Sequence, residues 1–175
     1  MNAITLLKKF ILIFLILGSG HSLFAQHDIQ WYNWSIGVQE AKRQNLPIMV
    51  SVYNNGCSWC EHMINTTYKD NKVIDYISQN FIAIKLNIEE KKPLHFKSKD
   101  YNFVKKGSHS YHTLAVDLLD GRYGTPAVIF VDQNQEVLQS LIGYKGSKNF
   151  LQILKYYGDE HYRDVPWHTF LERSN

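Results

Sequence analysis

The spacing of apolar residues along the chain predicts an alternation of helices and strands. Over residues 31–45, apolar side chains recur at intervals of three and four, which indicates a helix with one apolar face. A nearly continuous run of strand-forming residues follows at 48–53 and predicts a strand that is covered on both faces. A polar break ends this run, and a second helix is predicted to begin near Cys57.

The rest of the chain continues this alternation. The expected elements, in order, are a helix capped by Asp70 or Asn71 and reaching Ser78, a strand at 81–87, an irregular insertion at 89–107, a helix at 109–119, strands at 127–131 and 136–142, a helix capped by Ser147 and ended by Gly158, and a short helix near Trp167. This order implies an α/β domain. Its central mixed sheet of about four strands should have a parallel portion, one antiparallel hairpin and flanking helices.

The first 25 residues are predicted to lie outside this domain. Lys8 and Lys9 precede an apolar run, and small and polar residues then lead to Ala25. This order is typical of a secretory signal peptide, with cleavage near Ala25. An uncut anchor is the alternative, although the uncharged run at 10–26 is marginal for a span that needs roughly 20 apolar residues. The sequence therefore predicts a signal peptide at 1–25 and a periplasmic or secreted domain at 26–175.

Length and charge narrow the class of protein further. A mature chain of this size suits one domain that buries roughly 70% of the surface of its unfolded chain. The formal net charge of the whole chain is +3, and removal of Lys8 and Lys9 would leave +1. The charge therefore gives no indication of nucleic acid as a partner. The lysine-rich insertion at 89–107 is typical of a solvated loop, with a docking surface for an acidic partner as the alternative.

The chain has two cysteines, Cys57 and Cys60, and they lie three positions apart. A disulfide that closes so small a loop removes little entropy from the unfolded chain, so structural stabilisation is a poor explanation for it. A zinc site would need two further ligands, and no metal site is predicted. Covalent haem attachment requires a histidine directly after the second cysteine, where this chain has Glu61. Redox chemistry is the better explanation for the pair.

The position of the cysteines fits thiol–disulfide exchange. Only a thiolate attacks a disulfide, and a free cysteine with a pKa near 8.5 is mostly protonated at neutral pH. The start of a helix favours negative charge because its backbone N–H groups are unpaired. Cys57 is therefore predicted to be the exposed nucleophile. Cys60, one turn further along the helix, is predicted to attack the mixed disulfide and release the partner.

Two stretches of the chain resemble the thioredoxin superfamily. Residues 47–87 are similar to exported bacterial thioredoxin-like proteins in which a tryptophan, here Trp59, precedes the second cysteine. Residues 124–130 resemble the loop of this family that carries a cis-proline before a buried strand. The resemblance implies a thioredoxin-like fold with an insertion before the cis-proline strand. It also implies that Pro126 is cis and lies beside Cys57, and that Trp59, Thr125 and Pro126 contact a bound peptide.

The sequence also departs from this family. Thioredoxins carry a buried acidic residue in the strand before the motif, and the matching position here is Ser51. A hydroxyl cannot accept a proton in the same way, which leaves open how Cys60 is deprotonated.

The function predicted from these features is that of an exported thiol–disulfide oxidoreductase, with reduction of protein disulfides favoured over oxidation. Its partners would be protein disulfides or thiols and a redox partner for recycling, for which a membrane protein would supply electrons to a reductase. No dissociable cofactor is expected. One alternative function is a metal-binding or metal-delivery module that holds a soft ion such as Cu(I) through the same two thiolates. A second alternative is a redox-inactive interaction protein in which the motif is only a local disulfide clasp.

Overall fold

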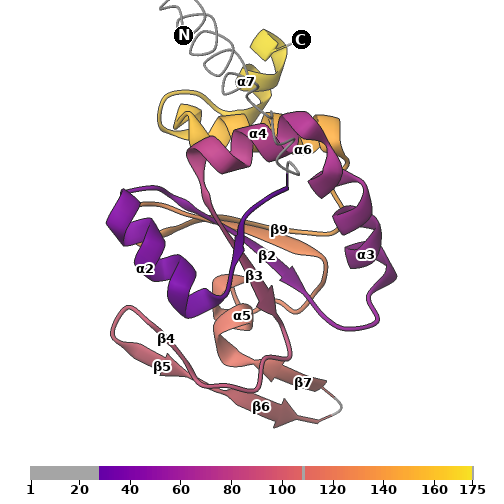
Figure 1. The fold of residues 1–175 in the computed structure, drawn as a ribbon, viewed down its shortest axis with the longest axis vertical. Coiled ribbons are helices and arrows are strands. Elements are labelled where there is room, and N and C mark those ends of the chain that lie inside the picture. The colour runs from indigo at the N-terminus through magenta and orange to yellow at the C-terminus, as the bar shows by residue number, and fades with distance from the viewer. Residues whose placement is uncertain (1–27, 108, 175) are drawn as a thin grey trace, which may run out of the picture.

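The computed structural model describes residues 28–107 and 109–174, so the predicted signal peptide lies outside the described residues. A five-stranded mixed sheet forms the centre of the domain, in the order β1-β3-β2-β8-β9 (Figure 1). Its strands are β1 (Trp31–Tyr32), β2 (Ile48–Tyr53), β3 (Ile82–Asn87), β8 (Ala127–Val131) and β9 (Val137–Ile142). β1, β3 and β2 are parallel, whereas β8 is antiparallel to β2 and β9 is antiparallel to β8. The predicted α/β class with one antiparallel hairpin is confirmed.

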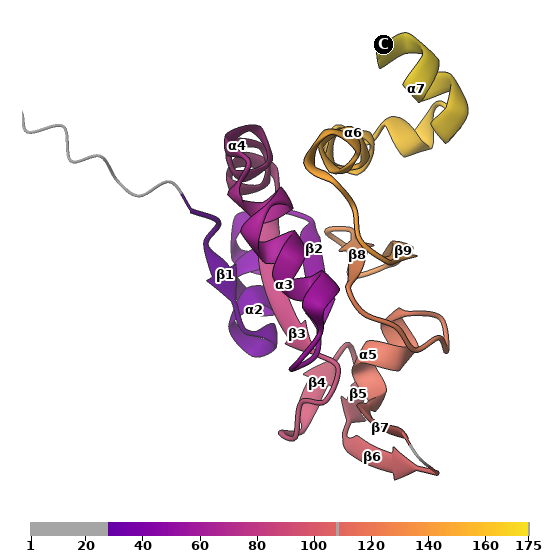
Figure 2. The same ribbon diagram turned by 90° about the vertical axis from the view of Figure 1, so that its right-hand side faces the viewer.

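Helices cover both faces of the sheet. One face packs against α2 (Trp34–Gln44) and α5 (Thr113–Leu118), and the other against α3 (Ser58–Asn65), α4 (Asn71–Asn80) and α6 (Ser147–Gly158). Because alternate residues of a strand point to opposite faces, Val50 contributes to the core under α2 while Met49 contributes to the core under α3 and α4. In Figure 2, α4 and α6 of one layer lie above the strands and α5 of the other layer lies below them.

The helix boundaries follow from capping residues. α2 begins after Asn33, whose side chain accepts a hydrogen bond from the Ile36 N–H, and it ends at Asn45 in the left-handed region. The predicted Asp70 cap of α4 is confirmed, since its carboxylate accepts hydrogen bonds from the Lys72 and Val73 N–H groups. The predicted Ser147 cap of α6 is wrong. Gly146 occupies the N-cap position of that helix and makes no side-chain cap bond.

Three other expectations are corrected by the structure. Trp31 does not begin a helix, because residues 31–32 pair with β3 as a fifth strand of the sheet. The insertion is not irregular, because it forms two hairpins that run beyond its predicted end. These are β4 (Leu94–Phe96) with β5 (Lys99–Tyr101), and β6 (Phe103–Lys106) with β7 (His109–His112). As a result α5 begins at Thr113 rather than at His109.

The hairpins and the C-terminal segment extend the domain at opposite ends. In Figure 1, β4 to β7 lie below the sheet beside α5, and α7 (Trp167–Ser174) lies above it next to α6. The 3₁₀ turns η1 (Thr67–Lys69) and η2 (His161–Arg163) connect helices. Phe170 of α7 is buried and its ring contacts Tyr156 of α6, so the predicted short packed helix is confirmed. Among the helices that the structure describes, none has the length and apolar character needed to cross a membrane.

Candidate active site

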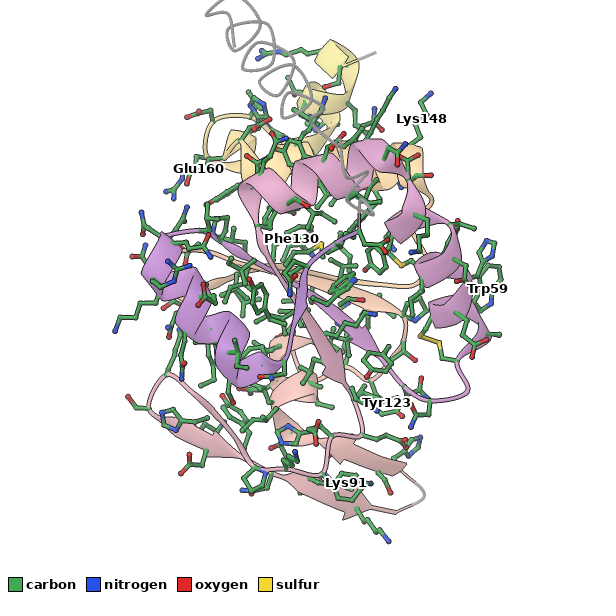
Figure 3. The ribbon with its side chains drawn as sticks, viewed as in Figure 1. Trp59, Lys91, Tyr123, Phe130, Lys148 and Glu160 are labelled. Carbon is green, nitrogen blue, oxygen red and sulfur yellow. A yellow bond between two sulfur atoms is a disulfide. The ribbon has the colours of Figure 1, made fainter. Side chains whose placement is uncertain are left out.

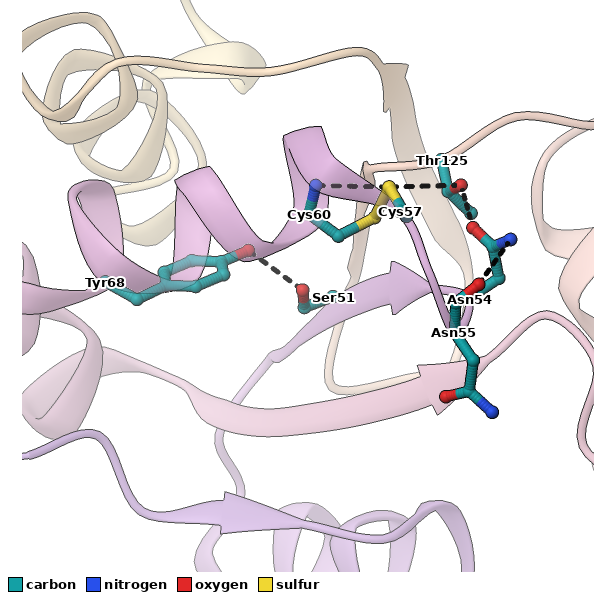
Figure 4. Close-up of a disulfide and its surroundings, with 7 residues drawn as sticks. All are labelled: Ser51, Asn54, Asn55, Cys57, Cys60, Tyr68 and Thr125. Atoms are coloured by element: carbon teal, nitrogen blue, oxygen red, sulfur yellow. Dashed lines mark hydrogen bonds between the residues drawn. A yellow bond between two sulfur atoms is a disulfide. The ribbon is translucent and has the colours of Figure 1, made fainter.

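The two cysteines form a disulfide at the start of α3 (Figure 4). Cys57 is the N-cap of this helix, and its Sγ accepts a hydrogen bond from the Cys60 N–H at 3.1 Å. The same helix end offers backbone N–H groups and the positive end of the helix dipole to any thiolate that forms on Cys57. Cys57 is partly exposed, whereas Cys60 is buried. This difference in exposure matches the predicted roles of an attacking and a resolving cysteine.

The loop before β8 approaches the disulfide from the other side. The Thr125–Pro126 peptide bond is cis, as the resemblance implied. The Thr125 hydroxyl lies 3.6 Å from the Cys57 Sγ and 2.5 Å from Oδ1 of Asn54. A hydroxyl has one proton to donate, and the shorter distance indicates that the Thr125 hydroxyl donates it to the Asn54 amide oxygen. The Cys60 N–H is therefore the closer donor to the Cys57 sulfur, and the Thr125 hydroxyl is engaged mainly with Asn54.

Trp59 lies on the rim of this site with most of its surface in solvent, since 59% of it is exposed (Figure 3). Its ring centroid is 5.6 Å from that of Tyr144 and 5.7 Å from that of His62. Tyr144 belongs to the loop after β9. This loop is held to η1, which follows α3, by a hydrogen bond from the Thr67 hydroxyl to the Lys145 carbonyl. The three rings form a surface next to the disulfide that a bound polypeptide could contact.

A cavity of about 120 Å³ lies behind Cys60, between α3 and the sheet. Ser51 and Lys85 occupy paired positions of β2 and β3 and both line this cavity. The Tyr68 hydroxyl, also at the cavity, donates a hydrogen bond of 3.0 Å to the Ser51 Oγ. Burial raises the pKa of Tyr68 well above its usual range, so this phenol stays protonated. Burial, aided by the positive charge of Lys69, lowers the pKa of Lys85 below its ordinary value.

The structure brings together all five residues predicted from the sequence. Cys57 and Cys60 form the disulfide, and around it lie Trp59, Thr125 and Pro126. Sequence reasoning missed Asn54, Tyr144 and the cavity residues Tyr68 and Lys85. A signal for Lys85 was present, because it is the one charged residue in β3 and has apolar neighbours on both sides in the sequence. Within the described part of the chain, no group of three or more His, Cys, Asp or Glu side chains is arranged to hold a metal ion.

Solved structures with a similar fold carry redox names. A thioredoxin-fold protein from Helicobacter pylori matches with a TM-score of 0.55 and 23% identity, over 75% of this chain and 80% of that one. A DsbH oxidoreductase matches with a TM-score of 0.53 and 14% identity, over 75% and 85% of the two chains. A putative disulphide-isomerase from Bacteroides thetaiotaomicron gives 0.53 and 19%, over 75% and 95%. At these identities the likeness shows a thioredoxin-like fold.

Curated relatives match a shorter segment. An uncharacterized protein of Caenorhabditis elegans, B0495.5, is 35% identical over 68 residues, and human spermatogenesis-associated protein 20 is 28% identical over the same length. Each match covers 38% of this chain and only 9% of the relative. A family model described as Thioredox_DsbH, protein of unknown function, DUF255, matches residues 21–149. This match covers well over half of the 175 residues, and the chain therefore belongs to the Thioredox_DsbH family.

Proposed function

We propose that this protein is an exported thiol–disulfide oxidoreductase that reduces disulfides in other proteins. The observation that carries the proposal is the disulfide between Cys57 at the start of α3 and the buried Cys60, beside the cis-proline loop. Export is inferred from the charged, apolar and small-residue pattern of residues 1–25. The proposal includes the direction of the exchange: the protein reduces substrate disulfides and does not oxidise substrate thiols.

The reaction proceeds in two exchanges starting from the dithiol. The Cys57 thiolate attacks one sulfur of the substrate disulfide, forms a mixed disulfide and displaces the first substrate thiolate. The Cys60 thiolate then attacks the Cys57 sulfur, forms the Cys57–Cys60 bond and displaces the second substrate thiolate. The two cysteines lose two electrons and two protons, and the substrate gains both. A separate dithiol donor, proposed to be a membrane-bound partner, must then reduce Cys57–Cys60 again.

The residues around the disulfide support a polypeptide as substrate. Trp59, His62 and Tyr144 form an exposed aromatic surface on one side of Cys57, and Thr125 lies on the other. Aromatic rings provide large contact areas that tolerate varied sequences, which suits a site that must accept different proteins.

Reduction of insulin tests this proposal. With dithiothreitol as donor and no added metal, the mature chain should accelerate insulin precipitation. Cys57→Ser should remove the acceleration entirely. Cys60→Ser should also stop turnover but retain the first exchange. After reduction and removal of dithiothreitol, it should therefore accumulate a mixed disulfide with insulin, which is seen on a non-reducing gel and is absent from a reducing gel. A wild-type protein that never cycles between dithiol and disulfide would overturn the proposal, and one equivalent of copurified Cu(I) would then favour metal delivery.

A further inference from the structure

A groove of about 350 Å³ lies between the β6–β7 hairpin and the loop that joins α5 to β8. We call it the hairpin groove, and it is lined by Lys106, His109, Tyr111, Val116, Gly121 and Tyr123. Tyr123 is 46% exposed and lies above the hairpin in Figure 3. It is two residues from Thr125, which contacts Cys57, and two residues of chain span at most about 7 Å. The groove therefore begins within a few residues of the reactive disulfide.

One face of the hairpin is turned toward this loop. In the register of the two strands, Lys106 lies opposite His109, and one step further along the same face Val104 lies opposite Tyr111. The rings of His109 and Tyr111 contact the ring of Tyr123, with centroids 5.7 Å and 6.3 Å away. Since Lys106 shares this face, its exposed ammonium lies at the edge of the groove.

The loop on the other side of the groove is held against β9. Arg122 donates a hydrogen bond of 2.7 Å from Nη2 to the Ser140 Oγ. A Cβ at Gly124 would lie 2.7 Å from the side chain of Ile142, so the loop backbone packs closely on the same strand. Tyr123, between these two anchors, is therefore presented by a fixed loop, and a ligand that binds there has little loop entropy to overcome.

The hairpin groove is positively charged. Residues 103–112 contain no Asp or Glu, and no residue that lines the groove is acidic. Asp120, which follows α5, is the nearest acid to the loop in the chain but does not line the groove. Lys97 of the neighbouring β4–β5 hairpin pairs with Glu136 at 2.7 Å, whereas Lys106 takes part in no ion pair with any residue that the structure describes. The Lys106 ammonium can therefore pair with a carboxylate of another molecule.

We propose that the hairpin groove binds an acidic segment of the polypeptide substrate whose disulfide reacts with Cys57. A substrate carboxylate pairs with Lys106, and the remainder of the segment packs on the rings of Tyr111 and Tyr123. The groove and the disulfide are joined by residues 123–125, so one substrate segment can reach both. Charge complementarity of this kind acts mainly on the rate of association and on the choice of partner. This inference rests on the proposed function, since it names the substrate class of the same site.

Two cysteine peptides, each activated with a thiopyridyl group, measure this preference. They differ only at the positions two to four residues from the cysteine on both sides, which are Glu in one peptide and Gln in the other. Reduced protein, freed of dithiothreitol, takes up the peptide disulfide, and the released thiopyridone gives a second-order rate constant. Comparison of the Glu-to-Gln rate ratio between protein variants cancels any difference in the intrinsic reactivity of the two peptides.

Lys106→Gln should lower this ratio about threefold, the size expected for one exposed ion pair, and Lys106→Glu should lower it further. The rate with the Gln peptide should change by less than about twofold, because an uncharged segment makes no ion pair. Added salt should lower the wild-type ratio toward that of Lys106→Gln, since it screens exposed charges.

Lys148 provides the matched control. It is an exposed lysine of α6 at the opposite end of the molecule from the hairpin (Figure 3), so Lys148→Gln makes the same change in net charge and should keep the wild-type ratio. If Lys106→Gln, shown to be folded by circular dichroism, also keeps the wild-type ratio, the hairpin groove does not select acidic segments while the proposed function stands. If the reduced wild-type protein releases no thiopyridone from either peptide, the proposed function itself fails.

Discussion

Acidification should lower the free energy of unfolding of this protein because it protonates one buried histidine, His112. His112 is completely buried at the junction of β7 and α5, and its Nδ1 accepts a hydrogen bond from the Leu114 N–H at 3.3 Å. Nδ1 is thus an acceptor, and the ring proton is assigned to Nε2, which has no hydrogen-bond partner among the described residues. A second proton must enter at Nδ1. It would remove the cap of α5 and create a buried charge.

The size and sign of the effect follow from the pKa of this imidazole. Burial lowers the pKa of His112 below the ordinary value of 6.5, which the unfolded chain retains. Between pH 6.5 and the folded-state pKa, the unfolded chain therefore binds one more proton than the folded protein. The free energy of unfolding should fall by up to about 1.4 kcal/mol for each pH unit in this window. Above pH 6.5 the imidazole is neutral in both states and contributes no slope.

Urea unfolding between pH 7.5 and pH 5 measures this slope. The matched variant is His112→Asn, whose side-chain oxygen can still cap α5 but does not titrate. Other titrating groups cancel in the difference between the two curves, so the difference reports His112 alone. Parallel curves for the two proteins would refute the reasoning. So would an NMR titration that places the folded-state pKa of His112 at or above 6.5.

Three further changes test the packing, capping and surface electrostatics. Phe130→Ala removes a fully buried ring that stacks on Tyr157, and should lower the free energy of unfolding in urea by about 3–5 kcal/mol; a loss below about 1 kcal/mol would contradict the packing. Asp70→Ala removes both cap bonds of α4 and should cost about 1 kcal/mol by the same assay, while Asp70→Asn should retain most of that stability. The hydrogen bond to Asp100 raises the pKa of His95, so Asp100→Asn should lower it in an NMR titration, and an unchanged midpoint would show that the pair does not form in solution.

Most of the candidate site could be predicted from the sequence, because its two reactive residues are close together in the chain. Cys57 and Cys60 lie one turn apart on the same helix, and the break after the apolar run of β2 places that turn at the end of a strand. The family resemblance added Thr125 and Pro126, which are far from the cysteines in the chain but beside them in space. No local pattern could have supplied that contact, because it depends on the pairing of β2 with β8.

The sequence by itself determined the long elements, the two faces of the central strands and the cysteine pair at a helix start. Those features arise from hydrophobic periodicity and capping, which act over a few neighbouring residues. The tertiary structure decided the rest. β1 has only two residues and β4 to β7 have three or four each, too few to display a period, so their pairing depends on the segments they meet. Likewise, Lys85 reaches the cavity behind Cys60 because β3 pairs with β2 in a register that only the assembled sheet defines.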